Sequence, residues 1–429
     1  MRKYILALGL ALMLVVPAAA EFAVETVDTG GTGEMTDIDL DPDGAPVICY
    51  YDATLDALKL VAWSEGGWSF TVVDDAGSRG QDCSVHVDAD GDPHLVYLDF
   101  VEYDLRYAYR EDDVWNLSSP VAQGYIGMGA RIAAAPDGEI RMAYLDGTEL
   151  KVGYVWLTPS GPSQYNIGGF RNLGGKATSL VVETASRAYM ATFNDVAGSL
   201  LIYRGHGLVW ESYLVDGAAT PWRFGWDNAM AQDDAGELHV AYYDQTNGEL
   251  HYAWGPWGAM DNEMLDESDW CGHPLDLAVE GHGRPHVCYY SETVQELRYG
   301  YRVSDEEGWL LYSIDSGEGV GRDCSIAVAD DGIVTIAYHD ALAGSLKVAV
   351  GSEAPPVVDD DDDDDDDNDD DNDDNDDNDD DDDNDDNDND NNDDNNDDDN
   401  DDNDVYDIDD DDDSDDDDDN DSNEDKCGC

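Results

Sequence analysis

The sequence repeats one pattern of residues seven times. In each unit an aromatic residue stands two positions before a short polar residue that closes a strand-like run, as in Tyr50-Tyr51-Asp52. The same anchor recurs at Tyr97-Leu98-Asp99, Tyr144-Leu145-Asp146, Phe193-Asn194-Asp195, Tyr242-Tyr243-Asp244, Tyr289-Tyr290-Ser291 and Tyr338-His339-Asp340. Successive anchors are 47, 47, 49, 49, 47 and 49 residues apart. This spacing indicates that the chain is built from copies of one supersecondary unit.

Each unit predicts four short strands. In the fifth unit Leu238, Val240 and Tyr242 alternate with His239 and Ala241, which is the period of two expected of a strand. Other anchors are a turn glycine (Gly44, Gly91, Gly138, Gly236, Gly283, Gly332) and a leucine that opens the next strand (Leu58, Leu105, Leu150, Leu200, Leu250, Leu297, Leu346). Repeats of about 40–50 residues with four strands are typical of β-propeller blades.

The two ends of the repeat region predict how the ring closes. The seventh unit stops after three strands, at Leu346 to Val350. The segment Phe22 to Asp28 resembles the fourth strands of other units. We therefore expect an all-β fold, a seven-bladed β-propeller closed by the N-terminal strand, because closure hides strand edges that an open array would expose. A closed ring is expected to be a monomer.

Composition divides the chain into four parts. Residues 1–20 have the charged start, apolar core and small-residue cleavage site of an export signal, with Arg2, Lys3 and Ala18-Ala19-Ala20 as its marks. Residues 21–351 hold the propeller, and 352–358 form a linker. Residues 359–429 form an Asp/Asn-rich tail with the ending Cys427-Gly428-Cys429, and we expect this tail to be disordered. The apolar run of the leader is too short for a membrane span, and no other stretch approaches one, so no span is expected in the mature chain.

The acidic residues restrict the partners. The chain carries 103 Asp and Glu residues and a net charge of −83, and roughly half of the acidic residues lie in the tail. An acidic surface repels phosphates, so a nucleic-acid partner is not expected. The tail is expected to act as a solvated spacer that could bind calcium loosely, and no other cofactor is expected.

Four of the seven cysteines fall in repeat register. Cys49 and Cys288 stand three residues before the strand-end residue of their unit, and Cys83 and Cys324 stand sixteen before theirs. This register predicts two disulfides, Cys49–Cys83 and Cys288–Cys324, which an exported protein could form. The alternative is a set of buried thiols. Cys271 has no counterpart in the repeat.

Two other repeated residue types could carry chemistry. His94, His239 and His286 share one register position, and we favour hydrogen bonding between blades over a zinc-like site. The strand-end aspartates are expected to accept backbone hydrogen bonds in turns. The turns Asp41-Pro42-Asp43-Gly44 and Asp88-Ala89-Asp90-Gly91 resemble calcium loops but lack the ligand spacing of an EF-hand.

The loops between blades provide the candidate ligand site. Aromatic and arginine side chains gather there in units four to six, and such residues on exposed loops are typical of binding sites. The candidate ligand-binding residues are Arg171, Trp222, Arg223, Trp226 and Trp270. The alternative is that these side chains plug the wider end of the ring. No nucleophile elbow, phosphate loop, dinucleotide fingerprint or metalloprotease motif is present, so no catalytic residue is assigned.

The segments Val85 to Asp99 and Leu105 to Arg110, followed by Trp115, resemble the Asp-Gly-x-Pro-His…Tyr-x-Asp repeats of secreted bacterial and archaeal propeller proteins, which are distantly similar to sialidase-like (Asp-box) propellers. The Asp/Asn tail resembles the C-terminal stalks of bacterial surface proteins. The resemblance implies the fold and an exported, extracellular or cell-surface location. The favoured hypothesis is a non-enzymatic propeller that binds a glycan or a surface protein. The alternatives are a sialidase-like carbohydrate-active enzyme and a structural surface or adhesion component.

Overall fold

The fold of the chain is given by a computed structural model. It describes residues 22–352 apart from 65, 123, 169–177, 195–196, 218–223, 269 and 305, and at 224–226 it describes the backbone alone. The predicted leader, the acidic tail and the linker beyond Ser352 lie outside the described residues. The part of the chain that the structure describes contains no helix long and apolar enough to cross a bilayer.

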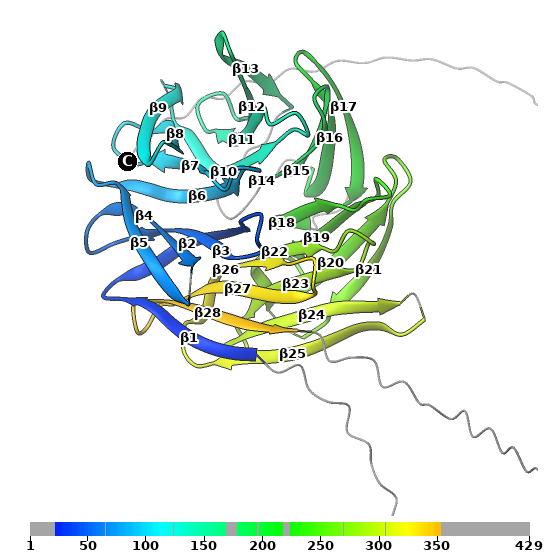
Figure 1. Cartoon of the computed structure of the whole chain (residues 1–429). Coiled ribbons are helices and arrows are strands. Elements are labelled where there is room, and N and C mark those ends of the chain that lie inside the picture. Colours follow the sequence, from blue (N-terminus) through cyan, green and yellow to red (C-terminus); the bar gives the residue numbers. More distant parts are fainter. Residues whose placement is uncertain are drawn as a thin grey trace, which may run out of the picture. The chain divides into compact units, whose positions relative to one another are not determined.

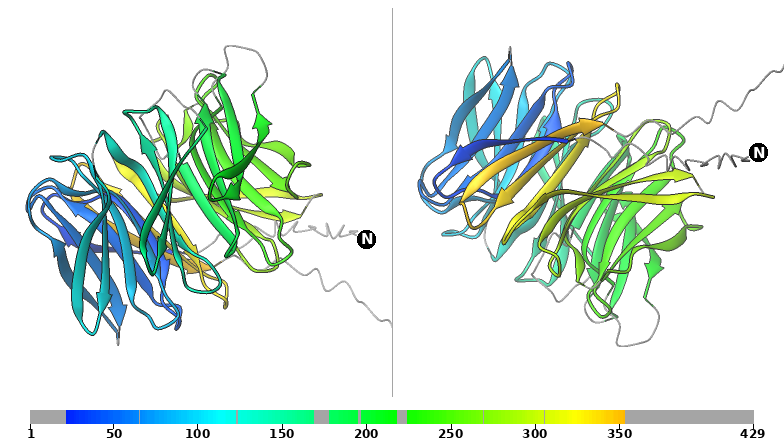
Figure 2. Two further views of the ribbon diagram at one scale, coloured as in Figure 1. Left: turned by 90° about the horizontal axis from the view of Figure 1, so that it is seen from above. Right: turned by 90° about the horizontal axis from the view of Figure 1, so that it is seen from below.

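Among the described residues, the strands form seven four-stranded antiparallel sheets arranged as a ring (Figures 1 and 2). The innermost strands of blades 1 to 7 are β2 (Thr32–Leu40), β6 (Arg79–Val87), β10 (Ile126–Ala134), β14 (Thr178–Thr184), β18 (Phe224–Gln232), β22 (Cys271–Val279) and β26 (Val320–Val328). The second strands are β3 (Pro46–Asp52), β7 (Pro93–Asp99), β11 (Ile140–Asp146), β15 (Arg187–Asn194), β19 (Leu238–Asp244), β23 (Pro285–Ser291) and β27 (Ile333–Asp340). This confirms the predicted seven-bladed propeller.

The two outer positions of each sheet complete the blades. The third strands are β4 (Ala57–Ser64), β8 (Asp104–Glu111), β12 (Lys151–Thr158), β16 (Ser199–His206), β20 (Glu249–Gly255), β24 (Glu296–Ser304) and β28 (Ser345–Ser352). The fourth strands are β5 (Gly67–Asp74), β9 (Val114–Val121), β13 (Gly161–Ile167), β17 (Val209–Asp216), β21 (Asp261–Asp266), β25 (Gly308–Ser316) and, for blade 7, β1 (Phe22–Thr29). The burial of β3, β11 and β19 on both faces reflects their position inside the sheets.

Closure of the ring is as predicted. The N-terminal strand β1 pairs with β28 from Phe22 opposite Gly351 to Thr29 opposite Ser345, so blade 7 combines both ends of the propeller (Figure 1). The two terminal segments therefore hold each other in register, and unfolding of either one exposes the edge of the other.

Glycines let neighbouring blades approach closely. A Cβ on Gly80 would lie 2.6 Å from the Cα of Leu58 in the preceding blade, and the φ of Gly80 is +109°. A side chain is therefore excluded both by space and by backbone conformation. The same arrangement of glycine on the leucine that opens the third strand of the previous blade recurs at Gly33 on Leu346, Gly127 on Leu105, Gly272 on Leu250 and Gly321 on Leu297.

A tyrosine–carboxylate hydrogen bond links most neighbouring blades. The tyrosine of the repeat anchor donates its hydroxyl to the aspartate that ends the fourth strand of the preceding blade, for example Tyr97 to Asp74 at 2.8 Å. The equivalent pairs are Tyr50–Asp28 at 2.6 Å, Tyr242–Asp216 at 2.7 Å, Tyr289–Asp266 at 2.6 Å and Tyr338–Asp315 at 2.7 Å. We call this the interblade latch. It gives the anchor tyrosine a physical role in these five blades.

Unit four departs from the register that the sequence predicted. Asn194 pairs with Ser199 at the end of β15, as Asp52 pairs with Ala57 in blade 1. The amide of Asn194 also accepts the backbone N–H of Ala197 at 3.2 Å, as a strand-end aspartate does. Thr192, and not Phe193, therefore occupies the anchor position, and the predicted anchor residue Asp195 lies outside the described residues.

One of the two predicted disulfides is formed. Cys49 and Cys83 are bridged with their Cα atoms 6.4 Å apart, which joins β3 of blade 1 to β6 of blade 2. Cys288 and Cys324 are buried thiols in the same core cluster, so the second predicted bridge is not formed in the structure. Cys324 Sγ instead lies 3.9 Å from the carbonyl oxygen of Pro274. Cys271 is a buried thiol, and burial raises its pKa to about 11.

Candidate ligand-binding pocket

Bulges in the innermost strands shape the mouth of the central channel. From Thr32 to Asp37 strand β2 advances five residues while its partner β3 advances three, from Asp52 to Cys49. The two extra residues interrupt the ladder, and Met35 there has a left-handed φ of 54°. The same step appears in β6, β10 and β26, with left-handed residues at Asp82, Gly129 and Asp323. Extra residues therefore turn side chains toward the channel mouth at matched places around the ring.

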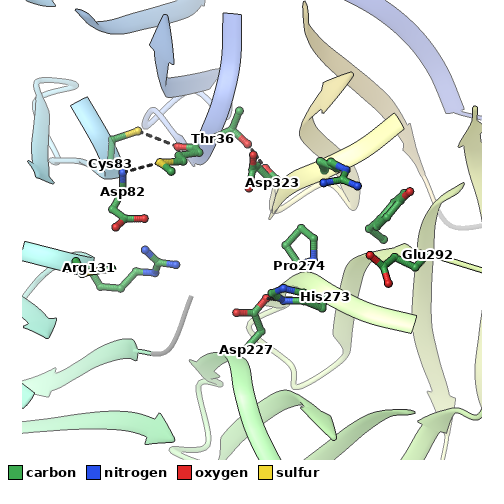
Figure 3. Close-up of a pocket in the computed structure, with 13 residues that line it drawn as sticks. Thr36, Asp82, Cys83, Arg131, Asp227, His273, Pro274, Glu292 and Asp323 are labelled. Carbon is green, nitrogen blue, oxygen red and sulfur yellow. Dashed lines mark hydrogen bonds and ion pairs between the residues drawn. The ribbon is translucent and has the colours of Figure 1, made fainter. Parts of the chain in front are cut away.

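A pocket of about 380 Å³ lies at this mouth. Figure 3 shows Arg131 and Asp82 on one side of it and the pair Asp227 and His273 on another. Asp323 of blade 7 and Glu292, which follows β23 in the same blade as His273, also line it. Met35, Thr36, Cys83, Met128, Pro274, Tyr290 and Arg322 complete the lining. Six of the seven blades contribute, and in the fourth blade the residues before β14 lie outside the described part of the chain.

A buried aspartate orients a histidine in the pocket. Asp227 on β18 is fully buried, and its Oδ2 lies 2.5 Å from Nδ1 of His273 on β22. The imidazole stacks on Tyr243, with ring centroids 5.8 Å apart. The negative charge of Asp227 raises the pKa of His273 to about 8. Most of His273 is therefore protonated at neutral pH, with its other ring nitrogen available to a ligand.

Two arginines face four carboxylates across the pocket. Arg322 is exposed, and its guanidinium lies 5.5 Å from the ring centre of Tyr290. Arg131 is half-buried and donates to the carbonyl oxygen of Ala130 at 2.7 Å. Asp82 accepts the backbone N–H of Gly129 at 3.3 Å, and this bond holds its carboxylate in the rim. Rigid donors and acceptors that alternate around a concave site suit a ligand rich in hydroxyl groups.

The predicted site residues lie mostly outside what the structure describes. Arg171, Trp222 and Arg223 fall in the gaps at 169–177 and 218–223, and only the backbone of Trp226 is described, in β18. Trp270 is described: it is 54% exposed, lies in the connection between β21 and β22, and accepts the N–H of Glu292 through its carbonyl oxygen. Trp270 does not line the pocket, whereas His273, three residues further on, does.

The three predicted structural histidines form hydrogen bonds inside their own blades, where contacts between blades were expected. His94 Nδ1 lies 2.6 Å from the Tyr107 hydroxyl, and its Nε2 lies 3.3 Å from Asp88 of the same blade. His286 likewise lies 2.8 Å from Tyr299 and 3.2 Å from Glu280. His239 repeats the contact with Tyr252 at 2.5 Å. The rings of His94 and His286 therefore join the first turn, the second strand and the third strand of one blade, whereas His239 is hydrogen-bonded to the third strand.

The strand-end aspartates are engaged by their own turns. Asp52 Oδ1 accepts the N–H groups of Thr54 and Leu55 at 3.0 and 2.9 Å. Asp41 and Asp88, in the turns that resemble calcium loops, each accept two backbone N–H groups through Oδ1, at 2.8 to 3.0 Å. These contacts confirm the predicted turn role of the aspartates.

Sequence reasoning missed Arg131, Asp227, Arg322, Asp323 and Asp82 as pocket residues. A signal for two of them was present. Asp82-Cys83-Ser84 and Asp323-Cys324-Ser325 are the same three residues at matched positions of units two and seven. This register was used only to predict disulfides from the cysteines. The aspartate before each cysteine lies in the bulge and lines the pocket.

No family model and no curated protein matches this sequence. Solved structures match its fold at low identity. The hydrazine synthase of Kuenenia stuttgartiensis is 11% identical, with a TM-score of 0.53 over 76% of this chain and 96% of that one. An ulvan lyase, a polysaccharide lyase bound to -[GlcA(1-4)Rha3S]-, is 10% identical, with a TM-score of 0.51 over 76% and 96%. AofleA from Arthrobotrys oligospora is 13% identical, with a TM-score of 0.48 over 70% and 91%. At these identities the likeness shows the fold alone.

Proposed function

We propose that this chain is an exported, non-enzymatic propeller that binds a glycan in the central pocket. The observation that carries the proposal is the convergence of Arg131, Arg322 and the Asp227–His273 pair on one concave site built from separate blades. Guanidinium and carboxylate groups form paired hydrogen bonds with neighbouring hydroxyls, which a sugar ring supplies on adjacent carbons. The pocket volume of about 380 Å³ lies within the usual range for small-ligand sites.

The balance of charges in the pocket favours a sugar that binds mainly through its hydroxyl groups over a densely anionic one. Asp82, Asp227, Glu292 and Asp323 place four carboxylates against two arginines and one protonated histidine. A densely anionic chain would meet as much repulsion as attraction there. The polysaccharide lyase with the same fold is bound to a saccharide, which supports the capacity of such a ring to hold one. The same proposal includes the location of the protein: the propeller is displayed outside the cell, and the acidic tail acts as a spacer.

The test is a glycan array followed by calorimetry with the mature full-length chain. Arg322→Gln removes a charged donor from the pocket and is expected to weaken binding about tenfold or more, since hydrogen bonds to charged groups contribute roughly 1.5–3 kcal/mol. The matched control is Arg187→Gln, which removes the same group from the exposed first residue of β15. Failure to bind any glycan, or equal losses from the two variants, would refute the pocket proposal.

A carbohydrate-active enzyme is the second candidate, because the Asp227–His273 pair has the geometry of an oriented proton donor. Incubation of the bound glycan with the wild-type chain, followed by mass analysis, distinguishes the two candidates. An unchanged glycan supports the binding protein. A cleaved glycan, with cleavage lost in His273→Gln, supports the enzyme.

A further inference from the structure

The interblade latch includes a cation in four of the blades. The residue on the third strand directly opposite the latch tyrosine is Lys59, Arg106, Arg298 or Lys347 in blades 1, 2, 6 and 7. Each cation approaches the aspartate that the tyrosine binds. Arg298 lies 3.0 Å from Asp266, Arg106 lies 3.8 Å from Asp74, and Lys59 and Lys347 form ion pairs with Asp28 and Asp315. A permanent positive charge therefore neutralises the latch carboxylate in these blades.

Blades 3 and 4 lack both charges together. At the end of the preceding fourth strand they have Val121 and Ile167 in place of the aspartate. Opposite the anchor position they have Gly153 and Leu201 in place of the cation. In six blades, therefore, the carboxylate and the cation are either both present or both absent. This pattern is expected when neither charge can be partly buried without the other.

Blade 5 breaks this rule. It keeps the latch, since Tyr242 donates to Asp216 at 2.7 Å, but the residue opposite Tyr242 is His251. Two more carboxylates lie close by, on Asp244 at the end of β19 and on Glu249 at the start of β20. Unlike lysine or arginine, histidine carries no permanent charge, so blade 5 lacks the fixed cation that blades 1, 2, 6 and 7 place opposite the latch tyrosine.

The three side chains are arranged as ligands. One donor atom from each of Asp244, Glu249 and His251 lies within 4.8 Å of the other two. Asp244 is fully buried, and its carboxylate is fixed by the Thr246 N–H at 2.8 Å and the Asn247 amide at 2.7 Å. His251 stacks on Tyr242 with ring centroids 5.5 Å apart, and its Nε2 lies 3.3 Å from Glu249. Two adjacent strands therefore hold the donors in place before any ion arrives.

We propose that Asp244, Glu249 and His251 bind a divalent transition-metal ion of the Zn²⁺ class, which supplies the positive charge that lysine or arginine supplies in the other latches. An imidazole nitrogen with two carboxylate oxygens is a donor set that suits Zn²⁺ or Co²⁺, whereas Ca²⁺ prefers oxygen donors alone. The ion would tie blade 5 together near its latch with blade 4. The role is structural, and it is separate from the glycan site proposed above.

The test compares Zn²⁺ binding by the mature full-length chain and its His251→Lys variant, using competition with a chromophoric chelator together with thermal unfolding. The acidic tail is the same in both proteins, so any weak binding by the tail cancels. The wild type is expected to bind one Zn²⁺ that the variant does not bind, and its melting temperature should rise with Zn²⁺. His251→Lys should show no such rise, and without metal it should melt at or above the metal-free wild type.

Two further variants keep the test decisive. Glu249→Gln should weaken Zn²⁺ binding roughly tenfold or more even if His251→Lys folds poorly. His282→Gln is the control, because His282 contacts Glu280 at 2.5 Å in the exposed turn before β23 and lies outside the proposed site. Equal Zn²⁺ affinity and equal thermal shifts in the wild type, His251→Lys and Glu249→Gln would overturn the proposal and assign the binding to other carboxylates.

Discussion

Ser325 Oγ lies 3.2 Å from Asp37 Oδ1 across the junction of blades 7 and 1, although 288 residues separate the two in the sequence. The same hydroxyl lies 2.6 Å from Asp276 Oδ2 of blade 6 and accepts the backbone N–H of Ile38 at 3.3 Å. Asp37 in turn accepts the N–H of Val85 in blade 2 at 2.9 Å. Polar side chains on the innermost strands therefore connect blades 6, 7, 1 and 2 around the channel and close the ring from the inside.

Ser325→Ala should destabilise the propeller by about 2–3 kcal/mol. The substitution leaves the Ile38 N–H and two carboxylates without a shared partner in a buried place, and loss of a buried partner costs roughly 1–3 kcal/mol. Ser84→Ala is the matched control, since Ser84 accepts a single N–H, that of Ile132, at 3.4 Å. Urea unfolding should show the larger loss for Ser325. Equal losses would mean that the connection between blades 7 and 1 is no more important than an ordinary contact.

The Cys49–Cys83 disulfide should make stability depend on redox conditions. The bridge closes a loop of 34 residues, for which the chain-entropy model gives a stabilisation of about 4 kcal/mol. Unfolding in urea with and without dithiothreitol should therefore differ by a few kcal/mol in the wild type. In Cys49→Ala/Cys83→Ala the difference should vanish. The difference should remain in Cys271→Ala, which removes a buried thiol outside the disulfide. If dithiothreitol destabilised the double variant as much as the wild type, the effect could not be assigned to the Cys49–Cys83 disulfide.

Acid should destabilise the fold through its buried histidines. Burial lowers the pKa of His286 to about 4, against 6.5 in the unfolded chain. Above pH 6.5 both states are neutral at this residue. As the pH falls toward 4 the unfolded state binds a proton that the native state excludes, so the free energy of unfolding falls by up to about 3 kcal/mol from this group. Unfolding curves between pH 4 and 7 measure the slope.

The control for the acid effect is a substitution that keeps a polar side chain at position 286 but removes the titrating group. His286→Gln should be less stable at pH 7, because it alters the contacts with Tyr299 and Glu280, but its stability should fall less steeply toward pH 4. An unchanged slope in this variant would show that His286 does not carry the acid sensitivity.

The ring was predictable because the blade is a local unit with a strong pattern. The tyrosine anchor, the alternation of strands such as β19 and the position of Phe22 to Asp28 all arise from contacts that recur in most of the blades. Unit four was misaligned by one residue because Phe193 mimics the anchor aromatic, while the true position is held by Thr192, which cannot donate to a latch carboxylate in the same way. Pattern alone could not distinguish the two.

The pocket was less predictable, for a physical reason. A strand pattern assigns side chains to faces by alternation, and each bulge adds two residues that break this alternation. Asp82 and Asp323 are left-handed residues within such bulges, so no period of two places them at the channel mouth. Asp227 and His273 are 46 residues apart in two consecutive blades, and the packing of blade 6 on blade 5 brings them together.

His273 should give the opposite pH dependence to His286. The charge of Asp227 raises the pKa of His273 to about 8, so its contribution to stability is fully present below pH 6.5 and is lost as the pH rises through 8. Because the imidazole is 47% exposed, solvent screening limits the effect to about 1 kcal/mol or less. Asp227→Asn keeps a polar partner without the charge, so the pKa of His273 should fall toward 6.5. An NMR titration of the histidine ring protons measures this directly. An unchanged pKa in Asp227→Asn would show that Asp227 does not set the charge of His273 in the pocket.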